Sequence, residues 1–203
     1  MNVKVLYTLS TLSCDPGDQF VMSTIDTDCV KNQALRHVIV NRRPRSDVKA
    51  QLIAGGVAYR AFLGRSGRSA FKREGDGATP VARMRLRCGY YRSDRVRLPQ
   101  SRLPMRAIRP DMGWCDAPGH GAYNGEVQLP FAASHERLWR EDGLYDICLV
   151  LDWNIRERRR FRGSAIFLHL SKGRPTEGCI AVSRRTMLRL LPMLGPRTVV
   201  KVV

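Results

Sequence analysis

The sequence predicts a single β-rich α/β domain, because its apolar runs are strand-length, one segment has clear helical spacing and turn formers are frequent. The longest apolar runs, such as 147–151 and 165–168, fall far short of the roughly 20 apolar residues that cross a membrane. Hydrophobic residues make up 43% of the 203 residues, close to the norm for globular proteins. We therefore expect one folded domain without a transmembrane segment.

The N-terminal segment differs from the rest of the chain in its hydrophobic pattern. Residues 1–37 have no clean hydrophobic period and include the turn-forming run Asp15–Pro16–Gly17–Asp18. A secretory signal normally has a longer apolar region and a small-residue cleavage site. We expect residues 1–37 to be an extension, either flexible or targeting, and residues 38–203 to form the folded domain.

Short strands joined by turns account for the first half of the domain. Residues 38–40 are β-branched, and residues 51–63 predict a hairpin around the turn Gly55–Gly56. The segment 64–82 is rich in glycine, serine and charge, which predicts a long loop. Arginine alternates with apolar residues over 83–88, so this strand should have a basic outer face and a buried inner face.

The second half contains the one confident helix. Residues 93–129 are rich in proline and turn formers, so little regular structure is expected there. Two continuous apolar strands follow at 145–151 and 164–168, separated by a basic turn. Apolar residues recur at helical spacing over Ser183–Leu194, with Ser183 as N-cap and a Gly–Pro pair after the end. Residues 199–203 form a last strand.

Positive charge is the strongest bias in the composition. The chain has 35 Lys and Arg against 18 Asp and Glu, a formal net charge of +17. Such a surface attracts polyanions, whether nucleic acid, anionic lipid or a carboxylate-rich polymer, and general solubility explains it equally well. Nucleic-acid binding predicts stacking aromatics or a recognition helix, yet aromatics are only 7%. A basic nucleic-acid-binding protein is therefore the least favoured alternative, and we expect no nucleic-acid partner.

The cysteines do not predict a metal site. None of the six forms a C-x-x-C pair, and their gaps match no zinc-ligand pattern. They are Cys14, Cys29, Cys88, Cys115, Cys148 and Cys179. Cys148 lies within an apolar run and should be a small core residue, whereas Cys179 has a different context.

Cys179 follows a glycine turn, ten residues after a histidine at a strand end. A thiol needs a base or cation beside it to be nucleophilic at neutral pH, and imidazole is the usual choice. Gly178 permits a tight turn that aims amide N–H groups at a developing oxyanion. We predict that Cys179 is the nucleophile, that His169 is its base, and that the amides of Gly178 and Cys179 are oxyanion donors. Without wider context, a core cysteine and an unrelated surface histidine would explain this stretch better.

Two motifs together supply that context. One is His169 followed by Thr176–Glu177–Gly178–Cys179, an apolar helix and a last strand. The other is the upstream loop Gly75–Asp76–Gly77–Ala78–Thr79–Pro80, which precedes a strand. In this order and spacing they resemble the catalytic segment of the L,D-transpeptidase (YkuD-type) family, over roughly residues 38–203.

The resemblance implies a β-sandwich catalytic domain with a few flanking helices, acting on peptidoglycan in the periplasm or cell envelope. In this family a cysteine attacks the L,D bond after diaminopimelate in a stem peptide and releases D-alanine. The thioester then passes to an amine, which forms a crosslink. No metal or organic cofactor takes part, and carbapenems are expected to inhibit. With water as acceptor the same thioester gives an L,D-carboxypeptidase or endopeptidase, and the sequence does not choose between these outcomes.

Two departures from the family pattern indicate a divergent branch. Glu177 stands where the family usually has histidine, and Ala181 stands where many members have arginine. A carboxylate beside a thiol disfavours the thiolate unless a cation compensates. We expect Lys172 or Arg174 to supply that cation.

Six residues are weaker candidates for substrate contacts. Trp114 could form a wall of the substrate groove, although a packed aromatic beneath a loop explains it better, and Asp76 could either contact substrate or orient its loop. The full set is Asp76, Trp114, Lys172, Arg174, Thr176 and Glu177.

Overall fold

The structure is a computed structural model that describes residues 34–203. The extension expected over residues 1–37 therefore lies almost entirely outside the described residues. The first strand, β1 (His37–Arg42), begins one residue before the expected domain boundary.

Strands dominate the described part of the chain, with one α-helix and one 3-10 turn. The remaining elements in order are β2 (Lys49–Ala54), β3 (Val57–Phe62), β4 (Arg68–Ser69), β5 (Thr79–Pro80), β6 (Arg83–Tyr91), β7 (Met105–Ala107), β8 (Met112–Cys115), β9 (Gly125–Gln128), β10 (His135–Arg137), β11 (Ile147–Leu151), β12 (Phe167–Leu170), β13 (Ile180–Val182), α2 (Arg184–Leu190), η1 (Leu191–Met193) and β14 (Val199–Val202).

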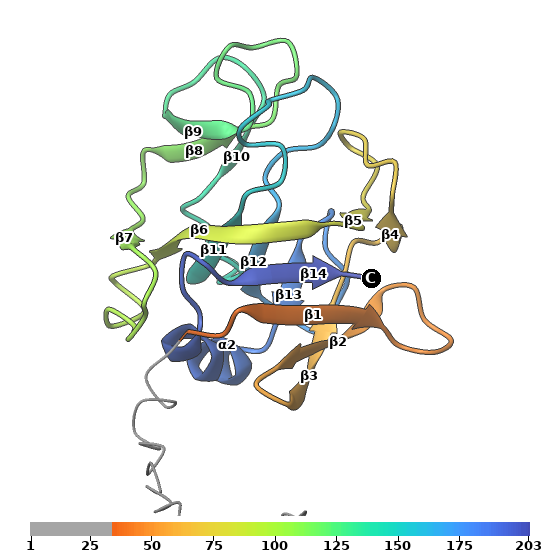
Figure 1. The fold of residues 1–203 in the computed structure, drawn as a ribbon. Coiled ribbons are helices and arrows are strands. Elements are labelled where there is room, and N and C mark those ends of the chain that lie inside the picture. Colours follow the sequence, from red (N-terminus) through yellow and green to blue (C-terminus); the bar gives the residue numbers. More distant parts are fainter. Residues whose placement is uncertain (1–33) are drawn as a thin grey trace, which may run out of the picture. The chain divides into compact units, whose positions relative to one another are not determined.

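The largest sheet closes on itself. Its strand order is β11-β12-β13-β3-β2-β1-β14-β6-β7, and β6 also pairs with β11 (Figure 1). The long strand β6 achieves this by pairing with β14 near its start and with β11 and β7 further along. Side chains from opposite strands meet inside this sheet and form the main core. The β-rich, sandwich-like class predicted from the sequence is confirmed.

The strands β11 and β12 are buried on both faces, which explains why their sequences are continuously apolar. Alternate side chains of β11, Ile147 and Leu149, point into the main core, whereas Cys148 and Val150 join a second core cluster. A three-stranded sheet with order β10-β8-β9 lies above this second cluster (Figure 1). The outer faces of β11 and β12 therefore pack beneath the β8–β10 sheet through the second cluster.

Most elements expected from sequence are present. The hairpin β2–β3 turns at Gly55–Gly56, both with positive φ. In β6 the buried Met84 and Leu86 alternate with exposed arginines, as the period of two predicted. Residues 93–129 are mostly turns and loops, as expected, but they include the short strands β7, β8 and β9. These strands have only three or four residues each, too few for a visible period.

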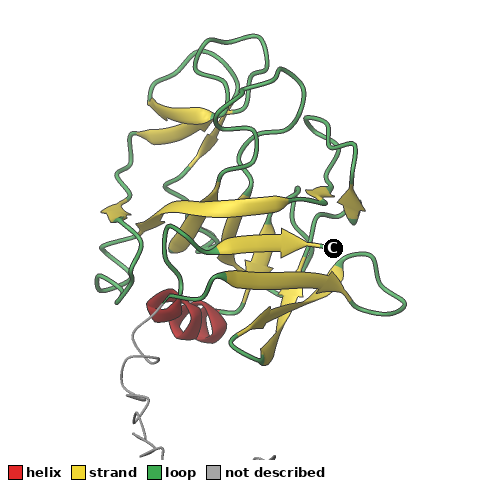
Figure 2. Ribbon diagram, viewed as in Figure 1, coloured by secondary structure: helices red, strands yellow, loops and turns green. Residues whose placement is uncertain are grey.

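The predicted helix is present but shorter. α2 covers Arg184–Leu190, and the hydroxyl of Ser183 accepts a hydrogen bond from the Thr186 amide as an N-cap. A 3-10 turn continues the helix through Met193, with Pro192 in its first positions. α2 packs Met187 and Leu190 onto the main core at one end of the strands (Figure 2).

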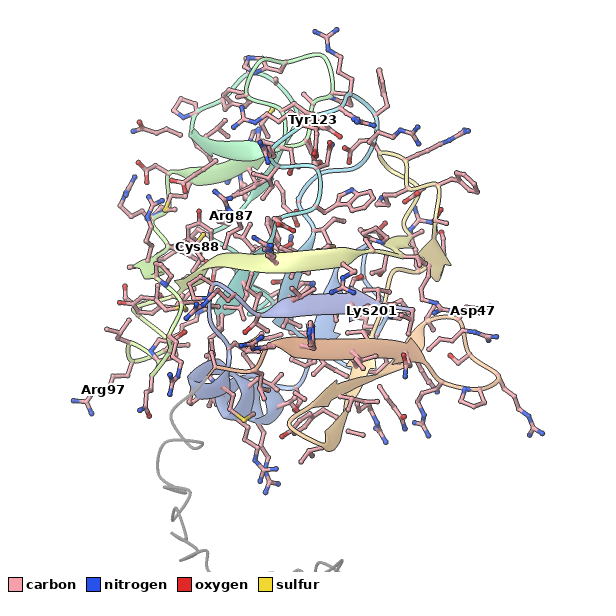
Figure 3. All side chains as sticks on the ribbon, viewed as in Figure 1. Asp47, Arg87, Cys88, Arg97, Tyr123 and Lys201 are labelled. Carbon is pink, nitrogen blue, oxygen red and sulfur yellow. The ribbon has the colours of Figure 1, made fainter. Side chains whose placement is uncertain are left out.

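The outer face of β6 and β14 carries exposed cations. Arg87 and Lys201 point away from these strands (Figure 3). Within residues 34–203, no helix is long and apolar enough to cross a bilayer. The cysteines of this part of the chain are free thiols, and Cys14 and Cys29 lie outside it. Cys148 is fully buried, as expected.

Candidate active site

Two neighbouring strands bring Cys179 and His169 together. β12 and β13 pair in parallel with Leu168 opposite Ile180 and His169 opposite Ala181. Cys179 directly precedes β13 and lies level with Phe167 in this register. Because side chains alternate along a strand, Cys179, Phe167 and His169 share one face of the sheet. That face is the one that lies beneath the β8–β10 sheet.

The imidazole of His169 is buried and its tautomer is defined by its partner. Nδ1 lies 2.8 Å from the Leu170 carbonyl oxygen. A carbonyl can only accept, so Nδ1 carries the proton and Nε2 of the neutral ring is an unprotonated base. Burial lowers the pKa of His169 to about 4, and the nearby Arg140 guanidinium acts in the same direction. The Tyr145 ring packs edge-on against the imidazole at 5.2 Å between centroids.

The Cys179 thiol is also held in its neutral form. Burial raises the pKa of Cys179 to about 12, with the Glu136 carboxylate adding to the rise. The thiol donates a hydrogen bond to the Ala165 carbonyl at 3.1 Å and accepts one from the Phe167 amide at 3.3 Å. Within residues 34–203 the thiol and the imidazole make no hydrogen bond with each other.

Both side chains line one cavity of about 490 Å³, here called the thiol cavity. With a thiol pKa near 12 and an imidazole pKa near 4, the resting pair is neutral at pH 7. A thiol that attacks from this neutral state transfers its proton to a base as the new bond to carbon forms, which is general-base catalysis. The predicted residues Thr176, Glu177, Lys172 and Arg174 also line this cavity.

The turn before Cys179 is held by the upstream motif. The Thr176 hydroxyl donates to the Cys179 carbonyl at 2.7 Å, and the Thr79 hydroxyl donates to the same oxygen at 3.2 Å. Gly178 has φ +135°, and a Cβ there would lie 3.0 Å from the Ala78 carbonyl oxygen. Gly64 packs still more closely, since its Cβ would lie 2.2 Å from the Gly77 oxygen. Contact between the two motifs explains why both occur in one sequence.

The amides of Gly178 and Cys179 are not equivalent. The Gly178 amide donates to the Thr176 hydroxyl at 3.2 Å. Among the hydrogen bonds of residues 34–203 outside the strand ladders, none uses the Cys179 amide. An oxyanion site needs a donor that is free to bond the developing charge. The Cys179 amide therefore meets this requirement better than the Gly178 amide.

Glu177 is compensated, but by a residue the sequence did not indicate. Nε of Arg65 donates to the Glu177 carboxylate at 2.7 Å, and the Arg65 amide bonds the Thr176 carbonyl. Lys172 and Arg174, expected to provide this cation, are exposed and make no ion pair in the described part of the chain. Because the Arg65–Glu177 pair is exposed to solvent, it contributes little to stability. The Arg65 guanidinium does, however, offset the negative charge of Glu177, which lies two residues before Cys179.

Asp76 organises its own loop. Its carboxylate accepts hydrogen bonds from the amides of Arg73 and Ala78 and from Nζ of Lys72 at 2.5 Å. These hydrogen bonds outweigh burial and lower the pKa of Asp76. Asp76 is absent from the wall of the thiol cavity, whereas the buried Lys72 reaches it. Of the two roles open from sequence, loop orientation is the one that these contacts support.

Trp114 likewise lies away from the cavity wall. Its ring packs edge-on against Phe167 at 5.3 Å, and its N–H donates to the Asn124 side chain at 3.1 Å. Trp114 thus supports Phe167 from above β12, as a packed aromatic beneath a loop.

Sequence reasoning missed a polar cluster in the wall of the cavity. The Tyr145 hydroxyl donates to the Glu136 carboxylate at 2.5 Å, and Arg140 lies 3.5 Å from the same oxygen. Burial raises the pKa of Glu136. The Tyr145 hydroxyl is therefore engaged by Glu136. Only spatial proximity to Cys179 singles out these residues, because no motif surrounds them.

Comparison with known families agrees with this geometry. The profile of the YkuD family, described as the L,D-transpeptidase catalytic domain, matches residues 36–202. No curated protein and no solved structure gives a significant match. Enzymes of this family are cysteine-dependent and act on peptidoglycan stem peptides. The chain therefore belongs to the YkuD family of L,D-transpeptidase catalytic domains.

Proposed function

We propose that the protein is an L,D-transpeptidase that forms a thioester between Cys179 and a peptidoglycan stem peptide. The observation that carries this proposal is the shared position of Cys179 and His169 on one face of β12 and β13, lining a single cavity. Family membership gives the substrate class, and the unprotonated Nε2 of His169 gives the base.

The acylation step uses the neutral pair directly. His169 Nε2 takes the thiol proton while the Cys179 sulfur bonds to the carbonyl carbon of the third stem residue. The Leu170 carbonyl, bonded to Nδ1, favours the imidazolium that results. The C–N bond then breaks, and the departing D-alanine amine takes the proton back from Nε2. A stem-peptide amine attacks the thioester by the reverse sequence, which forms the crosslink and restores the thiol.

In the tetrahedral intermediate, the Cys179 amide is assigned as the hydrogen-bond donor to the oxyanion. The Gly178 amide is a secondary donor. The Thr79 and Thr176 hydroxyls hold the Cys179 carbonyl, which fixes the peptide plane after Cys179 and restrains the residue that carries the amide. A donor that is already oriented needs no reorganisation during the reaction.

Recognition of substrate carboxylates is assigned to Lys172 and Arg174. Both line the thiol cavity and are exposed. Within residues 34–203 no carboxylate pairs with either of them. Stem peptides carry free carboxylates, so these two cations complement the substrate. Thr176 and Glu177 border the same entrance.

The deciding experiment incubates purified protein with diaminopimelate-containing tetrapeptide muropeptides and analyses the products by mass spectrometry. Crosslinked dimers are expected, and they should disappear in Cys179→Ala and in His169→Gln. Cys88→Ala is the matched control, because Cys88 is half-buried and does not line the cavity. Intact tetrapeptide with the wild-type protein would overturn the proposal.

The same products identify the acceptor. A trimmed tripeptide without dimers would indicate that water hydrolyses the thioester, making the protein an L,D-carboxypeptidase. Dimers joined through the third residues or through the first and third residues would define the crosslink type. Each outcome requires the same thioester on Cys179.

A second readout is covalent inhibition. We propose that carbapenems acylate Cys179, since a strained amide engages the same nucleophile and base. A mass increase of one inhibitor per chain, mapped to the peptide containing Cys179, is expected. Its absence from the wild-type protein would contradict an accessible nucleophile. Peptidoglycan as substrate places the site of action in the cell envelope, which a fusion to a compartment-specific reporter would test.

A further inference from the structure

A second cavity, of about 660 Å³, lies beside the thiol cavity and is lined by five arginines. We name it the arginine groove, after Arg83, Arg85, Arg156, Arg159 and Arg162. We propose that this groove binds carboxylates of the peptidoglycan polymer away from the thiol and so retains the substrate between reactions. The inference rests on the proposed function and adds a second binding site to it.

The groove is strongly cationic. Arg83 and Arg85 project from the outer face of β6, and the other three arginines come from the loop after β11. In the described part of the chain none of the five makes an ion pair. Only two carboxylates line the groove, Asp152 and Glu157, and that of Asp152 accepts a hydrogen bond from the Arg85 amide at 2.7 Å.

Concentrating these charges carries an energetic cost. Lys201 of β14 lies directly opposite Arg83 of β6, and like charges in this position repel. Lys201 and Arg87 project from the same outer face (Figure 3). An anionic ligand relieves this repulsion, and guanidinium groups bind carboxylates through two parallel hydrogen bonds.

The loop that carries three of the arginines is held in a defined shape. The buried side chain of Asn154 donates to the carbonyls of Arg159 and Gly163 at 2.9 and 3.0 Å. The same side chain accepts from the Arg159 amide at 2.8 Å. The indole N–H of Trp153 fixes the loop at the Arg162 carbonyl. A loop that is already ordered loses less conformational entropy when it binds a ligand.

Lys72 links the arginine groove to the thiol cavity, because it lines both. Its aliphatic stem passes over Gly163, where an added Cβ would lie 3.0 Å from the lysine carbons. The Glu74 amide bonds the Phe161 carbonyl and joins the two loops. A polymer that reaches Cys179 therefore passes near the groove.

Repeated carboxylates fit this groove better than a nucleic acid does. Single-stranded nucleic acids bind through aromatic platforms on which bases stack. Trp153 is the one aromatic residue in the lining, and its N–H is committed to the loop. Stem peptides, in contrast, carry free carboxylates, which the guanidinium groups of the groove complement.

The test measures sedimentation of the full chain with insoluble peptidoglycan sacculi, using Cys179→Ala so that no thioester forms. Replacement of Arg156, Arg159 and Arg162 by glutamine should weaken binding at least tenfold. The matched control replaces Arg43, Arg185 and Arg189 by glutamine, which removes equal charge from exposed positions elsewhere and should leave binding nearly unchanged. With Cys179 intact, the groove variant should process a soluble tetrapeptide muropeptide at the wild-type rate.

Three outcomes would overturn the groove assignment. They are equal loss of binding in both triple variants, unchanged binding to sacculi whose carboxyls are capped as amides, and stronger arginine-dependent binding to single-stranded DNA than to sacculi. Arginine-dependent binding to sacculi without acyl transfer to any substrate would instead refute the proposed activity and leave the groove standing. Acyl transfer without arginine-dependent binding would refute the groove assignment and leave the proposed activity standing.

Discussion

Individual residues set the pH range of this site. His169 and Cys179 are both held neutral by burial, which separates their pKa values to about 4 and about 12. Neither needs to change its protonation state between pH 5 and pH 10 before the reaction begins. Burial therefore favours a resting pair of neutral thiol and neutral imidazole over a thiolate–imidazolium pair.

Replacing His169 by glutamine should remove a pH-dependent loss of stability. The folded-state pKa of about 4 lies below the usual 6.5, so the unfolded chain binds a proton first as the pH falls. Stability is full above pH 6.5 and is lost between 6.5 and 4, by about 2 kcal/mol at pH 5. Urea unfolding at pH 7 and pH 5 measures this as a steeper decline in wild type than in His169→Gln. Equal declines would contradict a buried neutral imidazole.

At the scale of elements, the turn that precedes Cys179 depends on a loop far away in the sequence. Thr79 and Cys179 are 100 residues apart, and Arg65 and Glu177 are 112 residues apart. The loop from Gly64 to Thr79 therefore holds the turn that precedes Cys179 in its conformation. Its tightest point is Gly64, where the two ends of this loop meet.

Gly64→Ala should impair both stability and acylation. The new methyl group would lie 2.2 Å from the Gly77 oxygen and 2.9 Å from Ala78 Cα, so backbone must move. Overpacking of this kind costs about 1–3 kcal/mol, and movement of Ala78 and Thr79 disturbs the Cys179 carbonyl. Thermal unfolding and carbapenem acylation rates measure the two effects. Gly119→Ala, with no atom within 4 Å of its Cβ, is the neutral control.

Sequence reasoning found features that depend on local pattern. The hairpin at Gly55–Gly56 and the alternation in β6 follow from residues adjacent in the chain. The pairing of His169 with Cys179 followed from a motif. The Arg65–Glu177 contact and the cluster around Glu136 arise only when distant segments meet, so no local period reports them. β8 and β9 escaped detection because each has only four residues.

At the scale of the whole described domain, one strand closes the sheet. β14 lies between β1 and β6, parallel to the first and antiparallel to the second. Val200 and Val202 of this strand are buried in the main core. Loss of β14 would open both neighbouring strands to solvent at once.

Val200→Pro should prevent stable folding. Proline removes a backbone donor and fits poorly in a strand paired on both sides, so the free energy of unfolding should fall by at least the roughly 1–3 kcal/mol that a buried unpaired acceptor costs. Circular dichroism during heating measures the change. Leu98→Pro is the control, because Leu98 is exposed in a loop outside every strand. A wild-type melting temperature for Val200→Pro would contradict the central position of β14.

The position of β14 also affects how the protein matures. The Leu35 carbonyl meets the Thr198 hydroxyl across 163 residues, so the sheet cannot close until the segment that contains β14 has left the ribosome. Contacts this distant in sequence form slowly, and unpaired strand edges attract other chains in the meantime. A nascent chain that lacks β14 would thus remain open while the thiol turn is already synthesised. The turn that carries Cys179 is therefore complete before the sheet that buries its thiol can close.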